Sequence, residues 1–407
     1  MDSSQIKKAA GELSAQAVRF RRAIHARPEL SFAEHETSRY VADRLREAGI
    51  PFVPVAGTGL LARIEGQGDP ARCVVLRADM DALPIAEQNT FEYASRNAGV
   101  MHACGHDIHT ACLLGALMLL NGMRESVEGT VFGLFQPGEE VCPGGASLVL
   151  AEDPFLGYDI RAFIGEHVAP ELPVGSLGFR PGQYMASSDE IRIALHGSGG
   201  HGALPHTLTD PVVASAALIT SLQQIVSRNG DSTVPTVLSI GKLIADGATN
   251  VIPAVVEMEG TLRTMDEGWR TRAKQRIREI ASGIAAAYGV TAEIGIVDGY
   301  PCVVNDPELT GRARTIAAGL WGGEKIQELA LRMTAEDFGY YTERYPAVFF
   351  RLGVGRTDGR PTGGLHTPTF DPDEEAIRYG IATMAALALG LGPERTARTD
   401  APGAKTS

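Results

Sequence analysis

The sequence predicts an α/β fold, a mostly parallel sheet with helices that is interrupted by an inserted α+β domain of the ferredoxin-like type. Short apolar runs at 73–79, 130–137 and 161–167 alternate with helical patterns, as is typical of a parallel sheet. Residues 185–297 then follow the order β, α, β, β, α, β, which is the split βαβ order of a ferredoxin-like domain. Together the two patterns predict two structural units in one chain.

The first unit is expected to be discontinuous in sequence. We place it at 1–184 and 298–394, on either side of the insert at 185–297. A predicted strand at 346–355 and a predicted helix at 373–392 can complete its sheet and cover one face.

Two helix starts carry recognisable capping residues. Ser31 and Glu34 form a capping-box signature, and the helix that they open is expected to end at Gly49. In the insert, Asp210 followed by Pro211 is typical of the first residues of a helix.

Composition excludes several classes of protein. The 407 residues have a formal net charge of -12 and a pI near 5.4, which disfavours a nucleic-acid binder. No apolar run reaches about 18 residues, and the first residues lack the apolar core of a signal peptide. We therefore expect neither membrane insertion nor export, and a cytoplasmic location. Residues 395–407 are almost free of apolar side chains, so a disordered tail is expected there.

The cysteine count favours reduced thiols over a disulfide framework. There are five cysteines, an odd number spread thinly along the chain: Cys73, Cys104, Cys112, Cys142 and Cys302. A cysteine within a cluster of polar residues is therefore a candidate metal ligand or catalytic group.

Side chains that bind metals follow the predicted strands, where α/β folds place their active sites. Cys104 and His106 are separated by one glycine at a helix start, so both can turn toward one point. Glu139 and Glu140 directly follow the strand at 130–137, and adjacent carboxylates there repel each other unless a cation or a proton lies between them. One could ligate a metal while the other acts as a general base.

Each of these residues has a structural interpretation when it is considered alone. Cys104 could be a buried small hydrophobe, and the nearby histidines could be satisfied by hydrogen bonds. The two glutamates could be a solvated surface pair, and His167 and His366 could be structural histidines. Their combination on strand-end loops favours one metal site. A thiolate with imidazoles suits Zn, Ni, Co or Mn rather than Mg or Ca.

Eight ordered motifs over nearly the whole chain carry a resemblance to a known family. The sequence resembles the amidohydrolase branch of the dinuclear aminoacylase and carboxypeptidase-type metallopeptidases, which contains hippurate hydrolases, auxin-conjugate hydrolases and N-acetyl-diaminopimelate deacetylases. The motifs are, in order, RADMDALP, MHACGHDIHT, QPGEE, EHV, GGHGALPH, NVIP, AEDFGYY and LHTPTF.

The resemblance implies a role for each matching residue of the predicted metal site. It implies that Cys104 bridges two divalent metal ions and that Glu139 is the general base. The remaining implied ligands are His106, Glu140, His167 and His366. Asp79 and Asp81 resemble supporting carboxylates, and Asp81 is the stronger candidate for orienting a ligand imidazole.

The resemblance also extends to the insert, which it implies is a lid that forms the contact of a homodimer, with a tetramer as the alternative. His201 is implied to reach the partner subunit's active site and stabilise the oxyanion. Asn250 and Arg263 are implied to contact the substrate carboxylate. The structural alternatives are a residue supporting a turn for His201, a turn former for Asn250 and a surface strand residue for Arg263.

Two residues depart from the family pattern. Gly138 stands where alanine is usual, and we expect it to add only backbone freedom. Glu166 stands where a small or apolar residue is usual, and strand alternation predicts that it faces away from the metals.

The resulting functional hypothesis is hydrolysis of the amide bond of N-acyl amino acids. A dipeptidase or carboxypeptidase would need the same metals and differ in its acyl pocket. A non-catalytic binding protein with the same fold is a further alternative, although all five ligand positions and Glu139 are present. A serine hydrolase is disfavoured because no G-x-S-x-G motif occurs.

Overall fold

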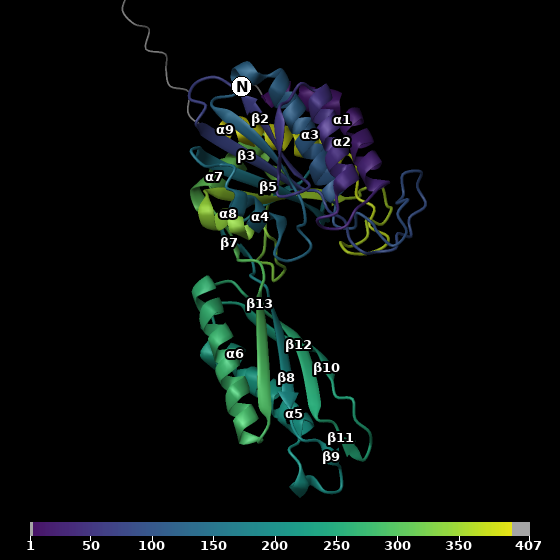
Figure 1. Cartoon of the computed structure of the whole chain (residues 1–407). Coiled ribbons are helices and arrows are strands. Elements are labelled where there is room, and N and C mark those ends of the chain that lie inside the picture. The colour runs from purple at the N-terminus through teal and green to yellow at the C-terminus, as the bar shows by residue number, and fades with distance from the viewer. Residues whose placement is uncertain (1–2, 393–407) are drawn as a thin grey trace, which may run out of the picture.

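A computed structural model describes residues 3–392, which form two lobes (Figure 1). The larger lobe contains an eight-stranded sheet. In spatial order its strands are β1 (Phe52–Val55), β2 (Gly59–Glu65), β4 (Thr130–Gln136), β3 (Arg72–Asp79), β5 (Asp159–Pro173), β16 (Ala347–Gly355), β6 (Leu177–Phe179) and β15 (Ile326–Glu328). The predicted disordered tail at 395–407 lies outside the described residues.

The centre of this sheet is parallel, as predicted. Strands β4, β3, β5 and β16 pair in parallel, whereas β1 and β2 extend the sheet antiparallel at one edge. Every residue of β4 and β16 is buried. Such continuous burial requires that helices cover both faces of the sheet.

Helices cover the two faces unequally. One face is packed by α1 (Ser3–His25), α2 (His35–Glu47), α3 (His106–Gly122), α7 (Pro307–Trp321) and α9 (Ala376–Leu391). The other face is packed by α4 (Gly145–Glu152) and α8 (Gly339–Arg344). None of the described helices combines the length and apolar character that a membrane span requires.

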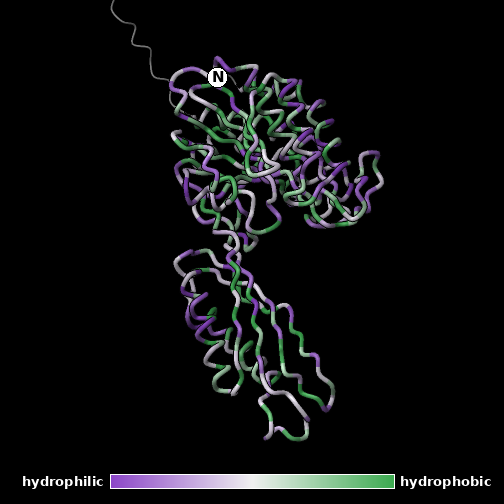
Figure 2. Tube along the Cα trace, viewed as in Figure 1, coloured by the Kyte–Doolittle hydropathy of each residue, from purple (hydrophilic) through white to green (hydrophobic). Residues whose placement is uncertain are grey.

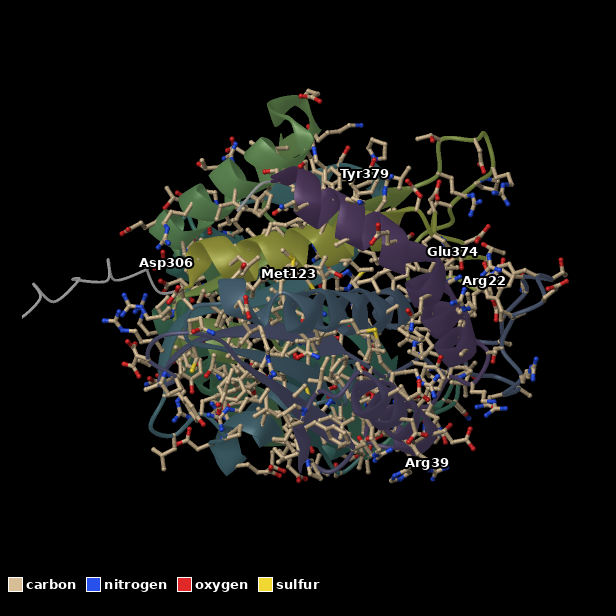
Figure 3. All side chains as sticks on the ribbon, turned by 90° about the horizontal axis from the view of Figure 1, so that it is seen from above. Arg22, Arg39, Met123, Asp306, Glu374 and Tyr379 are labelled. Atoms are coloured by element: carbon tan, nitrogen blue, oxygen red, sulfur yellow. The ribbon has the colours of Figure 1, made fainter. Side chains whose placement is uncertain are left out.

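Helix α1 is held to the segment before α9 by ion pairs. The Arg22 guanidinium donates to the Glu374 carboxylate at 2.9 and 3.2 Å, and Arg21 reaches the same carboxylate at 3.2 Å. Figure 3 shows Arg22 and Glu374 side by side at the edge of the helical layer. The first and last helices of the lobe are thereby joined across the sequence.

The smaller lobe contains a four-stranded antiparallel sheet in the order β10, β12, β8, β13. Its elements are β8 (Asp189–His196), α5 (Pro211–Leu222), β10 (Thr236–Ile244), β12 (Val255–Thr264), α6 (Glu267–Ala287) and β13 (Thr291–Asp298). This strand order confirms the predicted ferredoxin-like arrangement. Hydrophobic and hydrophilic residues alternate along these strands (Figure 2), because only one face of the sheet is covered by helices.

Two further strand pairs lie at opposite ends of the smaller lobe (Figure 1). At the connection between the lobes, β7 (Gly182–Met185) pairs with β14 (Val303–Asn305). At the far tip, β9 (Gly200–His201) pairs with β11 (Val251–Ile252).

One of the two predicted helix starts is wrong. Asp210 caps α5 as expected, accepting hydrogen bonds from Val212 N at 2.8 Å and Val213 N at 3.1 Å. Helix α2, by contrast, begins at His35, and Glu34 before it makes no side-chain cap. The Glu29 carboxylate instead accepts from the backbone N–H groups of Glu36 and Thr37, each at 2.9 Å. Ser31 and Glu34 fit the capping pattern, but tertiary partners take both side chains instead.

Ser31 Oγ donates to Asp81 Oδ2 at 2.6 Å. The Glu34 carboxylate is buried and accepts from the backbone N–H of Phe32 and of Gly138, each at 2.8 Å. The residues that looked like a local cap therefore join the segment before α2 to loops that follow β3 and β4.

The contact between α3 and α9 depends on Gly380. A Cβ atom at this position would lie 2.4 Å from Cys112 Sγ and 3.1 Å from Leu352 Cδ2, and both neighbours are fully buried. We expect Gly380→Ala to lower the free energy of unfolding by about 1–2 kcal/mol, because overpacking outweighs the gain in helix propensity. Urea denaturation measures the change.

The matched control is Gly319→Ala in α7, where an added Cβ meets nothing within 4 Å. That substitution should raise the free energy of unfolding by about 0.5–1 kcal/mol. Equal effects of the two substitutions would contradict the proposed role of Gly380.

Candidate metal centre

The predicted metal ligands meet at the carboxyl ends of the central parallel strands. Glu140 follows β4 and His167 lies within β5. Cys104 and His106 lie at the start of α3, and His366 lies in the loop between β16 and α9. Residues separated by up to 262 positions thus share one site.

Unusual backbone conformations aim two of these side chains. Gly105, between Cys104 and His106, has a φ of +86°, and a Cβ there would overlap Val168. His366 has a φ of +59°, and its backbone N–H donates to the carbonyl of Ala103 at 2.9 Å. This bond fixes the loop after β16 against the start of α3.

Cys104 lies at the centre of the group. Its Sγ atom is 3.4 Å from His167 Nε2 and 3.3 Å from His366 Nε2. On the far side, Glu140 Oε1 is 3.2 Å from His366 Nε2 and 4.0 Å from His106 Nε2. Cys104 belongs both to a trio with His106 and His167 and to a trio with Glu140 and His366, in each of which the ligand atoms lie within 4.8 Å of one another.

The chemistry of these residues fits two divalent metal ions. His106 Nε2 is buried and has no hydrogen-bond partner among the described residues, and an ion would satisfy this atom. Burial, and then Arg351, hold the pKa of His167 well below its ordinary value. Its ring is therefore neutral, which is the form that binds metals.

Glu139 lies beside this group without being part of either trio. Its side chain is buried in the wall of the cavity, and its backbone carbonyl accepts a hydrogen bond from Tyr300 OH. Burial, and then the charges of Glu336 and Glu140, raise the pKa of Glu139 well above its ordinary value. A carboxylate with a raised pKa is a stronger proton acceptor, as a general base requires.

The Asp81 carboxylate contacts the His106 imidazole, the ring that it was predicted to orient. Its Oδ1 atom lies 3.1 Å from His106 Nδ1, which also lies 2.9 Å from the Asp81 carbonyl. The other carboxylate oxygen, Oδ2, accepts from the backbone N–H of Glu140 at 2.9 Å. Although burial opposes ionisation, the hydrogen bond with His106 lowers the pKa of Asp81. One carboxylate thus positions two candidate ligands.

Asp79 contacts a different histidine. Its Oδ1 atom is 2.6 Å from His109 Nδ1, and His109 Nε2 accepts from the backbone N–H of Val168 at 2.9 Å. His109 therefore uses both ring nitrogens for hydrogen bonds and is not a candidate metal ligand. It links α3 to β5 next to His167.

A buried arginine that was not among the predicted site residues balances the surrounding acids. Arg77, in β3, donates to Asp79 at 2.7 Å, to Asp337 at 2.7 Å and to Glu336 at 3.0 Å. All four side chains are almost completely buried. An arginine within the apolar run at 73–79 was a usable signal in the sequence, since a charge inside a buried strand needs partners.

A second network also escaped prediction. Asp107, the neighbour of His106 on α3, accepts from Arg21 Nε at 2.6 Å and lies 2.7 Å from His25 Nδ1. All three side chains are fully buried. Only the pairing of α1 with the start of α3 brings them together, so spacing along the sequence gave no signal.

The metal centre opens into a cavity of about 940 Å³ between the lobes. Arg263, in β12 of the smaller lobe, lines this cavity together with the candidate ligands Cys104, Glu140, His167 and His366. Its Nη1 atom donates to the carbonyl of Met333 at 3.3 Å. Arg263 thus shares a cavity with the metal centre of its own chain.

The other two predicted substrate contacts lie elsewhere. His201 and Asn250 are neighbours at the far tip of the smaller lobe, where the Gly202 N–H donates to the Asn250 carbonyl at 2.9 Å (Figure 1). Arg263 in the cavity lies eight positions along the extended strand from Val255, near this tip, which is roughly 26 Å at about 3.3 Å per residue. Neither His201 nor Asn250 lines the cavity of its own chain.

The two departures from the family pattern have different outcomes. Gly138 does more than add backbone freedom, because its φ is +57° and a Cβ there would lie 2.2 Å from Cε1 of Phe32. The expectation of a purely flexible glycine was therefore wrong. Glu166 is buried beside Cys112 of α3, away from His167, and burial raises its pKa to about 8. It faces away from the metal centre, as strand alternation predicts.

The chain is similar to known proteins over most of its length. Residues 75–390 match Peptidase family M20/M25/M40. The chain is 40% identical over 374 residues to an N-acetylcysteine deacetylase of Bacillus subtilis, covering 91% of this chain and 96% of that protein. It is 36% identical over 389 residues to thermostable carboxypeptidase 2 of Saccharolobus solfataricus, covering 95% of this chain and 98% of that protein.

A solved structure is also similar. The crystal structure of a dinuclear metal-binding peptidase of the M20 family from Bacillus subtilis superimposes with a TM-score of 0.79 at 36% identity. The match covers 93% of this chain and 98% of that one.

The position of Asp81 leads to a test of the metal centre. We expect Asp81→Asn to weaken divalent metal binding roughly 10- to 100-fold, because the amide no longer fixes His106 and the loop of Glu140. Competition with a chromogenic chelator measures the affinity. The control is Asp69→Asn, which removes an exposed carboxylate from a loop outside the cavity and should leave metal affinity unchanged. Unchanged affinity in Asp81→Asn would rule out the orienting role.

Proposed function

Since the chain belongs to Peptidase family M20/M25/M40, we propose that this metal-dependent amidohydrolase cleaves the amide bond of N-acyl amino acids, releasing a carboxylic acid and a free amino acid. The arrangement of Cys104 carries this proposal. Its sulfur lies within 3.4 Å of two imidazoles, and Glu139 lines the same cavity. The similarity to an N-acetylcysteine deacetylase supports an N-acyl amino acid as the substrate.

The proposed ligands are Cys104 as the bridge, with His106, Glu140, His167 and His366. Two divalent ions held there, from among Zn, Mn, Co and Ni, would polarise the scissile carbonyl and make water more acidic. The thiol and imidazoles of the site favour these metals over Mg or Ca.

Glu139 is the proposed general base. Its carboxylate accepts a proton from the attacking water and returns it to the leaving nitrogen. Its raised pKa and its position in the cavity wall suit both transfers. Arg263, in the same cavity, would bind the substrate carboxylate through its guanidinium.

A homodimer would complete the site. His201 and Asn250 lie too far from the cavity of their own chain, so in this proposal they act in the partner subunit's site. The edge of the smaller lobe is suited to such a contact. Strand β10 is at the edge of its sheet. Two of its apolar residues, Leu243 and Ile244, have exposed fractions of 45% and 44%.

A carboxypeptidase or dipeptidase is the second candidate. The 36% identity to thermostable carboxypeptidase 2 favours it, and the same metals and base would serve. A panel of N-acetyl, N-benzoyl and N-aminoacyl amino acids separates the two, because faster cleavage of free dipeptides would favour the peptidase. A non-catalytic role is disfavoured because Glu139 and four of the five proposed ligands line one cavity, and the fifth, His106, forms a trio with Cys104 and His167.

Glu139→Gln tests the proposed base. We expect kcat to fall by about 10²–10⁴-fold, because the amide cannot accept the proton, while metal content by elemental analysis stays that of the unaltered protein. Glu125→Gln, on an exposed turn, is the control and should keep full activity. Turnover retained by Glu139→Gln would remove Glu139 from the mechanism.

Mixed oligomers test the proposed role of His201. Glu139→Gln and His201→Ala should each be inactive alone. After mild denaturation and co-refolding, a heterodimer has one site with intact Glu139 from one chain and intact His201 from the other. About a quarter of the original activity should then return on random mixing. If no activity returns although heterodimers are isolated, His201 does not act across subunits.

A further inference from the structure

The cavity has a basic wall in addition to its metal centre. Arg263, Arg332 and Arg351 all line it. Arg263 donates to the carbonyl of Met333, directly after Arg332, so two of the arginines come from adjoining segments. If Arg263 binds the one carboxylate of the substrate, the proposed reaction assigns no substrate group to Arg332 or Arg351.

Arg351 is buried without an acidic partner. It is 2% exposed, and in the pairing of β16 with β5 it lies directly beside the candidate ligand His167. Its contacts are neutral: Nε donates to Tyr184 OH at 2.6 Å, and Nη2 lies 3.2 Å from Met185 Sδ. Among the described residues, no carboxylate lies within ion-pair distance of its guanidinium. A buried charge of this kind is costly unless an anion pairs with it.

The acidic side chains around Arg351 and Arg332 already form ion pairs or are exposed to solvent. Glu336, which also lines the cavity, is bound to Arg77 at 3.0 Å. Glu171 forms an ion pair with Arg332, but its side chain is 49% exposed.

Arg332 forms a β-bridge with Met185, whose sulfur lies 3.2 Å from Arg351 Nη2, so the two arginines flank one residue. Burial, and then the charge of Arg351, lower the pKa of Arg332 to about 10. An anion between the two guanidinium groups would relieve the repulsion of their charges.

We infer that Arg351 and Arg332 bind a second carboxylate of the substrate, so that the preferred substrates are amides with a carboxylate in addition to the α-carboxylate. This inference rests on the proposed amidohydrolase function and adds the substrate class. The extra carboxylate can belong to the acyl group, as in an N-succinyl amino acid, or to the side chain of an acidic amino acid. Arg351 could instead only offset the acids around the metals, and the same experiments separate that role.

The first experiment compares kcat/KM within isosteric substrate pairs. One pair is N-succinyl-L-alanine and N-succinamoyl-L-alanine, and the other is N-acetyl-L-glutamate and N-acetyl-L-glutamine. We expect the charged member of one pair to be preferred by roughly ten- to hundredfold, which is what charge-assisted hydrogen bonds contribute. The pair that shows the preference identifies the source of the carboxylate. Ratios near one in both pairs, with N-acetyl-L-methionine still hydrolysed, overturn the inference and leave the proposed function standing.

Variants then assign the preference to the two arginines. Arg351→Met and Arg332→Met should each reduce the charged-to-neutral ratio about tenfold or more, and Arg351→Lys should restore part of it. Arg161→Met, an exposed residue near the start of β5, is the matched control and should keep the ratio. If Arg351→Met lowers kcat/KM equally for both members of a pair, Arg351 only offsets the charge of the acids around the metals, and the inference fails.

Binding provides a readout independent of turnover. Isothermal titration with succinate and with its monoamide, succinamate, should show at least tenfold tighter binding of succinate to the unaltered protein. Arg351→Met should remove that difference. Equal affinities in the unaltered protein would overturn the inference, even if no amide were hydrolysed.

Discussion

The metal centre depends on Arg77, whose guanidinium partly neutralises the buried carboxylates beside it. Five carboxylates are buried near the ends of β3 and β4, namely Asp79, Asp81, Glu139, Glu336 and Asp337. Arg77 donates to three of them from within β3. Even so, burial raises the pKa of Asp337 to about 8 despite its ion pair with Arg77. One guanidinium cannot neutralise this cluster, so divalent cations at the adjacent ligands would stabilise it electrostatically.

The strand order determines where the charged side chains gather. The parallel strands β4, β3, β5 and β16 end at the same edge of the sheet, so acids, imidazoles and arginines gather there. The three arginines Arg263, Arg332 and Arg351 come from other segments than the acids beside the metal centre. The acids beside the metal centre follow β3 and β4, whereas Arg351 projects from β16, Arg263 comes from β12 of the smaller lobe and Arg332 precedes α8. An amide substrate between these two groups would present its carbonyl to the metals and its carboxylates to the arginines.

Residues that follow a strand or form a compact motif were predictable. The parallel sheet, the ferredoxin-like order and the grouping of Cys104 with His106, or of Glu139 with Glu140, follow from hydrophobic periodicity and short spacings. The assignment of His167 and His366 to the same site relied on resemblance to a family. Periodicity could not place them, because a lone histidine in a strand or a loop has no distinguishing local pattern.

The sequence by itself determined the fold class and the type of chemistry, because apolar periodicity and clustered ligand residues are local properties. Only the tertiary structure decided which partners the side chains take. Ser31 and Glu34 fit a capping box, yet they bind Asp81 and the Gly138 loop. Gly138 accommodates Phe32, and Arg351 is buried without an acid. Each of these outcomes depends on segments that meet only after folding, and their burial makes every unpaired polar group costly.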